Sequence, residues 1–302
     1  MVINSISDVL NILTTFLSLF FAFYLLSLKS RNRLSNALIS FYLIISAIDS
    51  GAVFSGQFIY PYYPGLGLFL NTSLFLSPPL LYFYIRSVTY EDFKLKQKHL
   101  WHIIPFVIAL LLLLPRFFLA DHDKKIEVLT ASDGLNIELK LVYLLLHIQI
   151  ITYIIACYIV ILKSKKLLLE NYSQGNMNYY KWLITLVTLI AIEVVVSTFK
   201  NVFMLYNLKV EYELALTITG LSALLFICWL VIKALQTPEL YGRVDSKQLL
   251  VKQLIATSPL KATSAQVDEE SKEAISRLRA HMNTKEPYLE PSLSIYHLSR
   301  QL

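Results

Sequence analysis

The sequence predicts an all-α membrane protein, a bundle of seven transmembrane helices followed by a polar tail. Hydrophobic residues make up 56% of the 302 residues and charged residues only 16%, whereas a typical soluble domain is about 25% charged. Seven apolar stretches each reach the roughly 20 residues that a helix needs to cross a bilayer. A soluble core this rich in Leu, Ile, Phe and Tyr would leave too little polar surface to cover it.

The seven predicted spans follow one another with short connections, and only the third is irregular. In that span Ser77, Pro78 and Pro79 interrupt the apolar run. Proline removes a backbone donor and kinks a helix, but neighbouring helices can satisfy the carbonyl groups that it frees. We therefore expect a kink near Pro78 within an intact span. In order, the spans cover residues 8–28, 34–56, 68–89, 100–119, 139–162, 182–206 and 212–235.

Basic residues are distributed unevenly between the connections. The segments 29–33, 86–99 and 163–181 hold three, four and four Lys and Arg residues, whereas 116–140 holds four and 200–211 holds two. Lys and Arg accumulate in short loops on the cytoplasmic side of a membrane. The sequence therefore predicts a multi-pass protein of the inner (cytoplasmic) membrane, with its N-terminus outside and its C-terminus in the cytoplasm.

Six polar or charged residues inside the spans are candidate ligand-sensing residues. Inserting an ionisable group into a membrane costs about 2.5–3.5 kcal/mol on insertion scales, so each such residue indicates a structural or functional role. Five share the outer half of the bilayer and the sixth, Glu193, lies near the middle, so they could converge on an outward-facing pocket with Glu193 at its floor. The alternative is pairing between helices, such as Asp49 with Lys200. The candidates are Asp49, Asn71, Arg116, His147, Glu193 and Lys200.

Residues for catalysis or metal binding are not apparent in the sequence. No HExxH, GxSxG or DDxxD motif occurs. Cys157 and Cys228 lie in apolar runs, which is typical of buried small side chains. His99 and His102 lie beside Trp101 at the start of the fourth span, where we expect them to anchor the helix. The sequence thus predicts a protein that is not an enzyme and holds no metal or cofactor.

The composition becomes polar after residue 235. Gln236-Thr237-Pro238 ends the last span, and residues 236–270 are predicted to form a cytoplasmic linker with a short helical turn at 248–255. From Glu270 an apolar spacing of three and four residues predicts an amphipathic helix of about 13 residues. A second helix, capped by Ser294, is expected to run to residue 302.

The tail resembles the opening of the AraC-type helix-turn-helix domain. The residues that carry this resemblance are Ile275–Met282, Glu286–Ile295 and His297–Leu302, with Ser299 where the family usually has Ala. The apolar part, with Lys98–Phe106 and a Pro238–Tyr241 exit, resembles the seven-span module that precedes this domain in some membrane-anchored regulators. The resemblance implies three segments: a sensor domain over 1–235, the linker over 236–270 and the first helix-turn-helix elements over 271–302.

The recognition helix of that domain is expected to be missing from this chain. In helix-turn-helix proteins the second helix of each motif reads the major groove, and residue 302 falls where the first helix would end. The resemblance therefore assigns no DNA-contacting residue, and we expect the chain to be a fragment or a truncated product that does not itself bind an operator.

The leading hypothesis is a membrane-embedded signal receptor that regulates transcription. It would lie in the lipid bilayer and sense an unknown small ligand or membrane signal in the outer half of the bundle. The seventh span and the linker would pass the change to a DNA-binding domain, by altering its position or its assembly as a homodimer. Two alternatives stay open: the seven-span input domain of a sensor histidine kinase, and a transporter or membrane enzyme. Against the kinase, Pro287 ends the helix of His281; against the transporter, no internal repeat appears.

Overall fold

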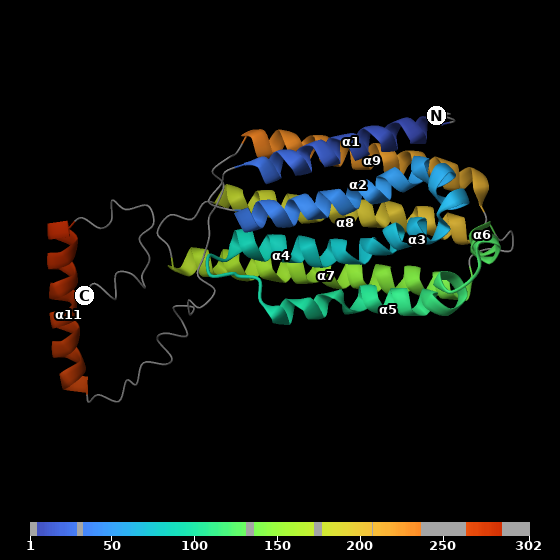
Figure 1. The fold of residues 1–302 in the computed structure, drawn as a ribbon. Helices are drawn as coiled ribbons and strands as arrows, with labels where there is room; N and C mark the ends of the chain where they lie inside the picture. The colour runs from blue at the N-terminus through green and yellow to red at the C-terminus, as the bar shows by residue number, and fades with distance from the viewer. Residues whose placement is uncertain are drawn as a thin grey trace.

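The computed structural model describes residues 5–28, 33–130, 136–171, 177–206, 208–236 and 264–285, and every regular element in these ranges is a helix (Figure 1). Seven helical stretches are long and apolar enough to cross a membrane, which confirms the seven predicted spans. These stretches are Ile6–Ser27, Arg33–Tyr62, Pro64–Thr89, Gln97–Phe118, Ile137–Leu169, Tyr179–Leu205 and Lys209–Ala234.

Some helices extend beyond the predicted apolar runs. The second span is the single helix α2 (Arg33–Tyr62), and the fifth is α7 (Ile137–Asn171). An apolar run records only the length that lipid covers, whereas a helix continues for as long as its backbone bonds persist. The sixth and seventh spans are α8 (Met177–Leu205) and α9 (Lys209–Gln236), and a short polar helix, α6 (His122–Thr130), precedes α7.

The first span, α1 (Ile6–Ser27), has its polar face turned inward. Its start is capped by Ser5, whose hydroxyl accepts a bond from the backbone N–H of Asp8 at 3.3 Å. Large apolar side chains of α1 are exposed, while polar residues at helical spacing are buried in the bundle. This arrangement suits a helix whose outer face contacts lipid. The buried polar residues are Ser7, Asn11, Thr14 and Ser18, and the exposed apolar ones include Phe16, Phe20 and Phe23.

The third span is kinked but continuous, as predicted. Its segments are α3 (Pro64–Thr72), a 3-10 turn η1 (Ser73–Leu76) and α4 (Ser77–Thr89). Pro78 and Pro79 lie in the first turn of α4, so two carbonyl groups one turn earlier lose their usual donors. The Leu74 carbonyl accepts from the Ser77 backbone N–H, and the Phe75 carbonyl accepts from the buried Gln149 amide of α7 at 3.1 Å. A neighbouring helix thus supplies a hydrogen-bond donor to a carbonyl group that the prolines leave unpaired.

Six of the spans form a closed ring. Helix α1 packs against α2 and α9, α2 packs against α4, α4 against α7, α7 against α8, and α8 against α9. In Figure 1, α1, α2 and α4 form one layer, and α9, α8 and α7 form the layer behind it. The fourth span, built from η2 (Gln97–Ile103), α5 (Ile104–Leu113) and a π-helical turn η3 (Leu114–Phe118), lies outside this ring against α7 and α3.

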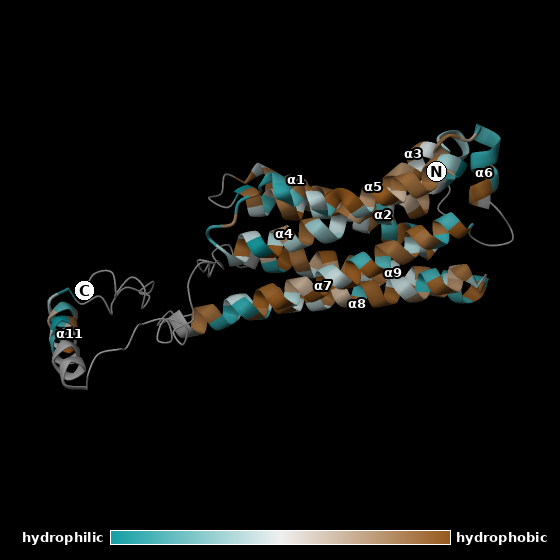
Figure 2. Cartoon of the chain, turned by 90° about the horizontal axis from the view of Figure 1, so that it is seen from below, coloured by the Kyte–Doolittle hydropathy of each residue, from teal (hydrophilic) through white to brown (hydrophobic). Residues whose placement is uncertain are grey.

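The interior of the ring is filled at one end only. At the end of the basic loops, large side chains from all six helices make one core, including the buried Leu43, Ile85, Ile161, Leu183 and Ile227. A smaller apolar cluster in the other half lies between α3, α5 and α7, outside the centre of the ring. Hydrophobic residues dominate the spans in Figure 2, whereas α6 is partly hydrophilic. The other half of the ring interior is therefore left for polar side chains.

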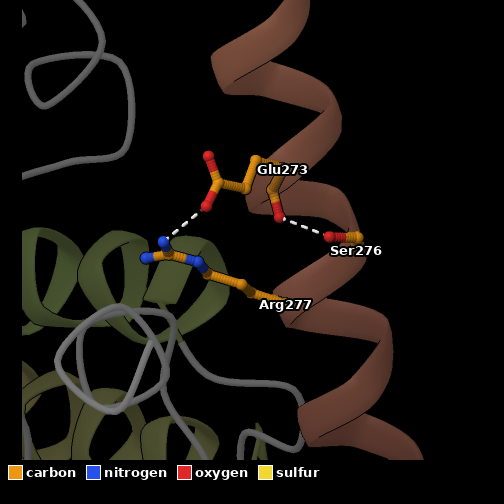
Figure 3. A network of polar contacts seen from close by, with 3 residues as sticks. All are labelled: Glu273, Ser276 and Arg277. Carbon is orange, nitrogen blue, oxygen red and sulfur yellow. Dashed lines mark hydrogen bonds and ion pairs between the residues drawn. The ribbon is translucent and has the colours of Figure 1, made fainter.

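The tail contributes one described helix, α11 (Ser264–Lys285). It confirms the predicted helix but begins earlier than Glu270, because the preceding Ser-Ala-Gln-Val-Asp-Glu stretch contains good helix formers. The Arg277 guanidinium lies 2.6 Å from the carboxylate of Glu273, one turn earlier in the helix. Figure 3 shows this ion pair. Both side chains are exposed, so this pair contributes only a few tenths of a kcal/mol. The predicted turn at 248–255 and the helix from Ser294 lie outside the described residues.

Candidate ligand-binding cavity

A cavity of about 460 Å³ occupies the half of the ring that the core leaves open. Residues from α1, α2, α7, α8 and α9 line it, together with α3, η1 and the first residue of α4. The fourth span contributes none of the lining, because it packs outside the ring. The volume falls within the roughly 300–1,000 Å³ of small-molecule pockets.

Five of the six candidate residues predicted from the sequence line this one cavity: Asp49, Asn71, His147, Glu193 and Lys200. They come from four different elements, which are α2, α3, α7 and α8. Asp49 is exposed and the other four side chains are half-buried. The structure therefore brings these residues together, as their shared depth led us to expect.

Arg116 is the exception, and the structure places it elsewhere. It lies on η3 in the fourth span, where its Nη1 atom is 3.2 Å from Oε1 of Glu138 on α7. Its side chain is 68% exposed. A sequence gives the depth of a residue in a span but not the side of the bundle on which that span packs. The structure therefore does not bring Arg116 to the cavity with the other five candidates.

The carboxylate of Glu193 links two helices of the ring. The Ser222 hydroxyl of α9 donates to Oε2 of Glu193 on α8 at 3.0 Å, and also to the Thr219 carbonyl at 3.1 Å. An intramolecular hydrogen bond contributes about 0.5–1.5 kcal/mol. Any movement of Glu193 therefore disturbs the contact between α8 and α9.

The alternative of a direct pair between Asp49 and Lys200 is not what the structure shows. Within the described part of the chain, no ion pair joins Asp49 or Lys200 to another side chain. The two residues lie in opposite layers of the ring, on α2 and α8, and both line the cavity between the layers. Their charges are thus available to a molecule in the cavity.

Neutral polar groups complete the wall of the cavity. His147 donates from Nδ1 to the Tyr143 carbonyl at 2.7 Å, which fixes its tautomer and leaves Nε2 as an acceptor when the ring is neutral. Asn71 lies beside the hydroxyl groups of Tyr60 and Tyr143. These tyrosines were not predicted as site residues, because tyrosine is also common at membrane interfaces. Other lining residues absent from the prediction are Asn11, Thr14, Ser18, Tyr42, Ser197, Asn201 and Tyr212.

One of these omissions had a signal in the sequence. Asn11, Thr14 and Ser18 recur at three and four residues, which places them on one face of α1. A polar stripe on an otherwise apolar span indicates the side that faces away from lipid. The same stripe faces the cavity in the structure.

Tyr60 packs tightly at the junction of α2 and α3. A Cβ atom added to Gly67 would lie 2.6 Å from Cε1 of the Tyr60 ring, and one added to Gly56 would lie 3.2 Å from the same ring. A side chain at position 67 would displace the Tyr60 ring, whereas one at position 56 would require it to move by only a few tenths of an ångström. Since Tyr60 lines the cavity, α3 positions part of its wall.

A second polar cluster lies at the basic end of the bundle, away from the cavity. His102 hydrogen-bonds through Nδ1 to the Tyr153 hydroxyl, and the rings of His99 and His102 lie 5.1 and 4.9 Å from that of Phe83. These contacts agree with the predicted role of the two histidines in anchoring the fourth span. Among the described residues, no group of three or more His, Cys, Asp or Glu could hold a metal ion.

The fold and the cavity define the class of protein: a multi-pass membrane protein in which six of seven helices surround a charged, polar cavity. No protein-family model, curated protein or solved structure matches the chain. Its function is therefore inferred from the cavity and from the sequence.

Proposed function

We propose that the protein is a membrane-embedded receptor that senses a small ligand in the cavity and regulates transcription. The observation that supports sensing is the cavity itself, in which charged groups at membrane depth face an open space between the layers of the ring. Intramembrane charges are costly and commonly mark functional sites. The contribution of six spans to one cavity gives a ligand contact with most of the bundle.

Helix α9 connects the cavity to the tail. It lines the cavity from Tyr212 to Ile227 and continues without interruption to Gln236, where the polar tail follows. The bond from Ser222 to Glu193 ties it to α8. A ligand that binds one arrangement of α8 and α9 more tightly than another shifts the population of the two. Helix α9 is thus the element through which binding would reach the tail.

The transcriptional part of the proposal is supported by the sequence of the tail. Residues 271–302 resemble the opening of the AraC-type domain, and α11 includes the first matching stretch. DNA binding is proposed for a protein that carries the complete domain. The excess of basic residues in three connections favours a cytoplasmic tail in an inner-membrane protein, which is where such a domain would meet DNA.

The test of this proposal substitutes the charged residues of the cavity. In a protein that carries the complete DNA-binding domain, Asp49→Asn and Lys200→Met are expected to change the set of transcripts that depends on the gene. The transcripts are measured by RNA sequencing, and the amount of protein in the membrane fraction is expected to stay normal. Each substitution removes a charge that a ligand would contact.

The matched controls are Glu213→Gln and Lys209→Met, which change exposed residues of α9 that do not line the cavity. These two variants are expected to leave the transcripts unchanged. If Asp49→Asn and Lys200→Met both behave like the controls, the cavity does not sense the signal and the proposal is wrong.

A further inference from the structure

We infer that the cavity binds a small zwitterion of the amino-acid type, a molecule that carries both an ammonium group and a carboxylate. This inference rests on the proposed function, since it names the ligand class of the same cavity.

The first argument is the balance of charges. The cavity is lined by two carboxylates, Asp49 and Glu193, and by the ammonium group of Lys200. Within the described residues none of the three takes part in an ion pair. A wholly cationic ligand would leave Lys200 without a counter-charge, and a wholly anionic ligand would do the same to both carboxylates. A zwitterion supplies a counter-charge to each sign.

The second argument is the position of these charges along the bundle. Asp49 and Glu193 each lie 16 residues from the start of a helix that begins at the basic end, at Arg33 and Met177. They therefore lie at a similar depth on α2 and α8, which face each other across the cavity, and both line it.

Lys200 lies two turns further along α8 than Glu193, about 10 Å at 1.5 Å per residue. Residues seven apart share a helix face, so Lys200 lies above Glu193 on the same wall. The negative end of the cavity is therefore separated from its positive end, and a ligand is oriented with its ammonium group toward the two carboxylates and its own carboxylate toward Lys200.

The third argument is the uncharged part of the wall. Tyr42, Tyr60, Tyr143 and Tyr212 line the cavity beside Phe226. Aromatic rings attract an ammonium group through their π faces and pack against an apolar side chain. Tyrosine hydroxyls and the Asn71 amide provide further partners for charged ligand groups. An amino acid combines these features within 460 Å³.

The experiment measures binding to the full-length purified chain by calorimetry and by its thermal unfolding midpoint. The first probes are the twenty common amino acids. For each amino acid that binds, the matched amine without its carboxylate and the matched acid without its amine are tested, for example phenylalanine, phenethylamine and phenylpropionate. The zwitterion is expected to bind at least about tenfold more tightly than either partial analogue, since each analogue leaves one wall charge unpaired.

Variants assign each end of the ligand to its wall residue. Lys200→Met is expected to weaken binding of the zwitterion about tenfold or more. Binding of the amine should not change, because the amine has no carboxylate for Lys200 to contact. Asp49→Asn is expected to weaken binding of the zwitterion and of the amine, and to leave binding of the acid unchanged. Lys209→Met and Glu213→Gln should bind all three probes as the unsubstituted protein does.

Two results would overturn the inference. If the amines bind as tightly as the zwitterions, Lys200 does not hold a ligand carboxylate. If no amino acid binds, the ligand class is wrong. Neither result decides the proposed function, which depends on the transcript response to Asp49→Asn and Lys200→Met.

Discussion

Single residues of the cavity wall differ in how well their roles could be predicted. Asp49, Glu193 and Lys200 stand out in apolar runs because a charge in a membrane needs a reason. Arg116 has the same property, yet it pairs with Glu138 outside the ring. Tyr60 and Tyr143 line the cavity without any comparable signal, since a tyrosine suits lipid, core and interface alike. Charge thus identified the candidate residues, but only the packing of the helices distinguishes those that line the cavity from Arg116, which does not.

Gly67 provides a test of the cavity wall at the scale of one side chain. Gly67→Ala is expected to destabilise the protein by about 1–3 kcal/mol, because the new methyl group overlaps the Tyr60 ring. The measurement is the thermal unfolding midpoint in detergent.

Gly65→Ala is the matched control in the same helix, since no atom lies within 4 Å of its added Cβ. This substitution is expected to be neutral or to stabilise by up to about 1 kcal/mol through the lower helix propensity of glycine. Equal midpoints for the two variants would show that Tyr60 does not pack on α3 as described.

At the scale of elements, the kink of the third span could be predicted from the sequence, whereas the residue that stabilises it depends on packing. Pro78 and Pro79 predicted the kink, because two adjacent prolines remove two backbone donors. They did not predict which neighbour would satisfy the freed carbonyl groups. That partner, Gln149, lies on α7, far along the chain, and reaches the Phe75 carbonyl only because α4 and α7 are adjacent in the ring.

Replacing Gln149 by Leu is expected to lower the free energy of unfolding by about 1–3 kcal/mol, since it leaves a buried carbonyl without a donor. The same change in a Pro79→Leu background should cost less, because residue 79 then offers its own N–H to Phe75. Unfolding of the four proteins in a double-mutant cycle measures this difference.

Gln57→Leu is the control for that cycle. The Gln57 amide is exposed and donates to the Phe54 carbonyl three residues earlier, so its loss should cost less than about 0.5 kcal/mol. A cost for Gln149→Leu that is unchanged by Pro79→Leu would mean that the amide does not compensate for the proline.

At the scale of the whole molecule, the sequence predicted the number and order of the spans, because the bilayer imposes a length and a composition on each of them. The closed ring was beyond prediction. Which helices become neighbours depends on side-chain packing between segments far apart in the chain, and the peripheral place of the fourth span has no counterpart in its composition. The cavity follows from the ring, because α2 and α8 face each other across it.

The most direct measurement is the reactivity of single cysteines on α8 toward a charged, membrane-impermeant thiol reagent added to intact cells. In a background without Cys157 and Cys228, Ser197→Cys places a thiol on the cavity wall and Val195→Cys places one on the exposed apolar face. A thiol reacts as its thiolate, which forms in water but not in lipid. We predict that the cysteine at 197 is modified and the one at 195 is not. Equal reactivity at both positions, or modification at 197 only after the cells are broken, would contradict our proposal that the charged cavity opens to the outside of the cell.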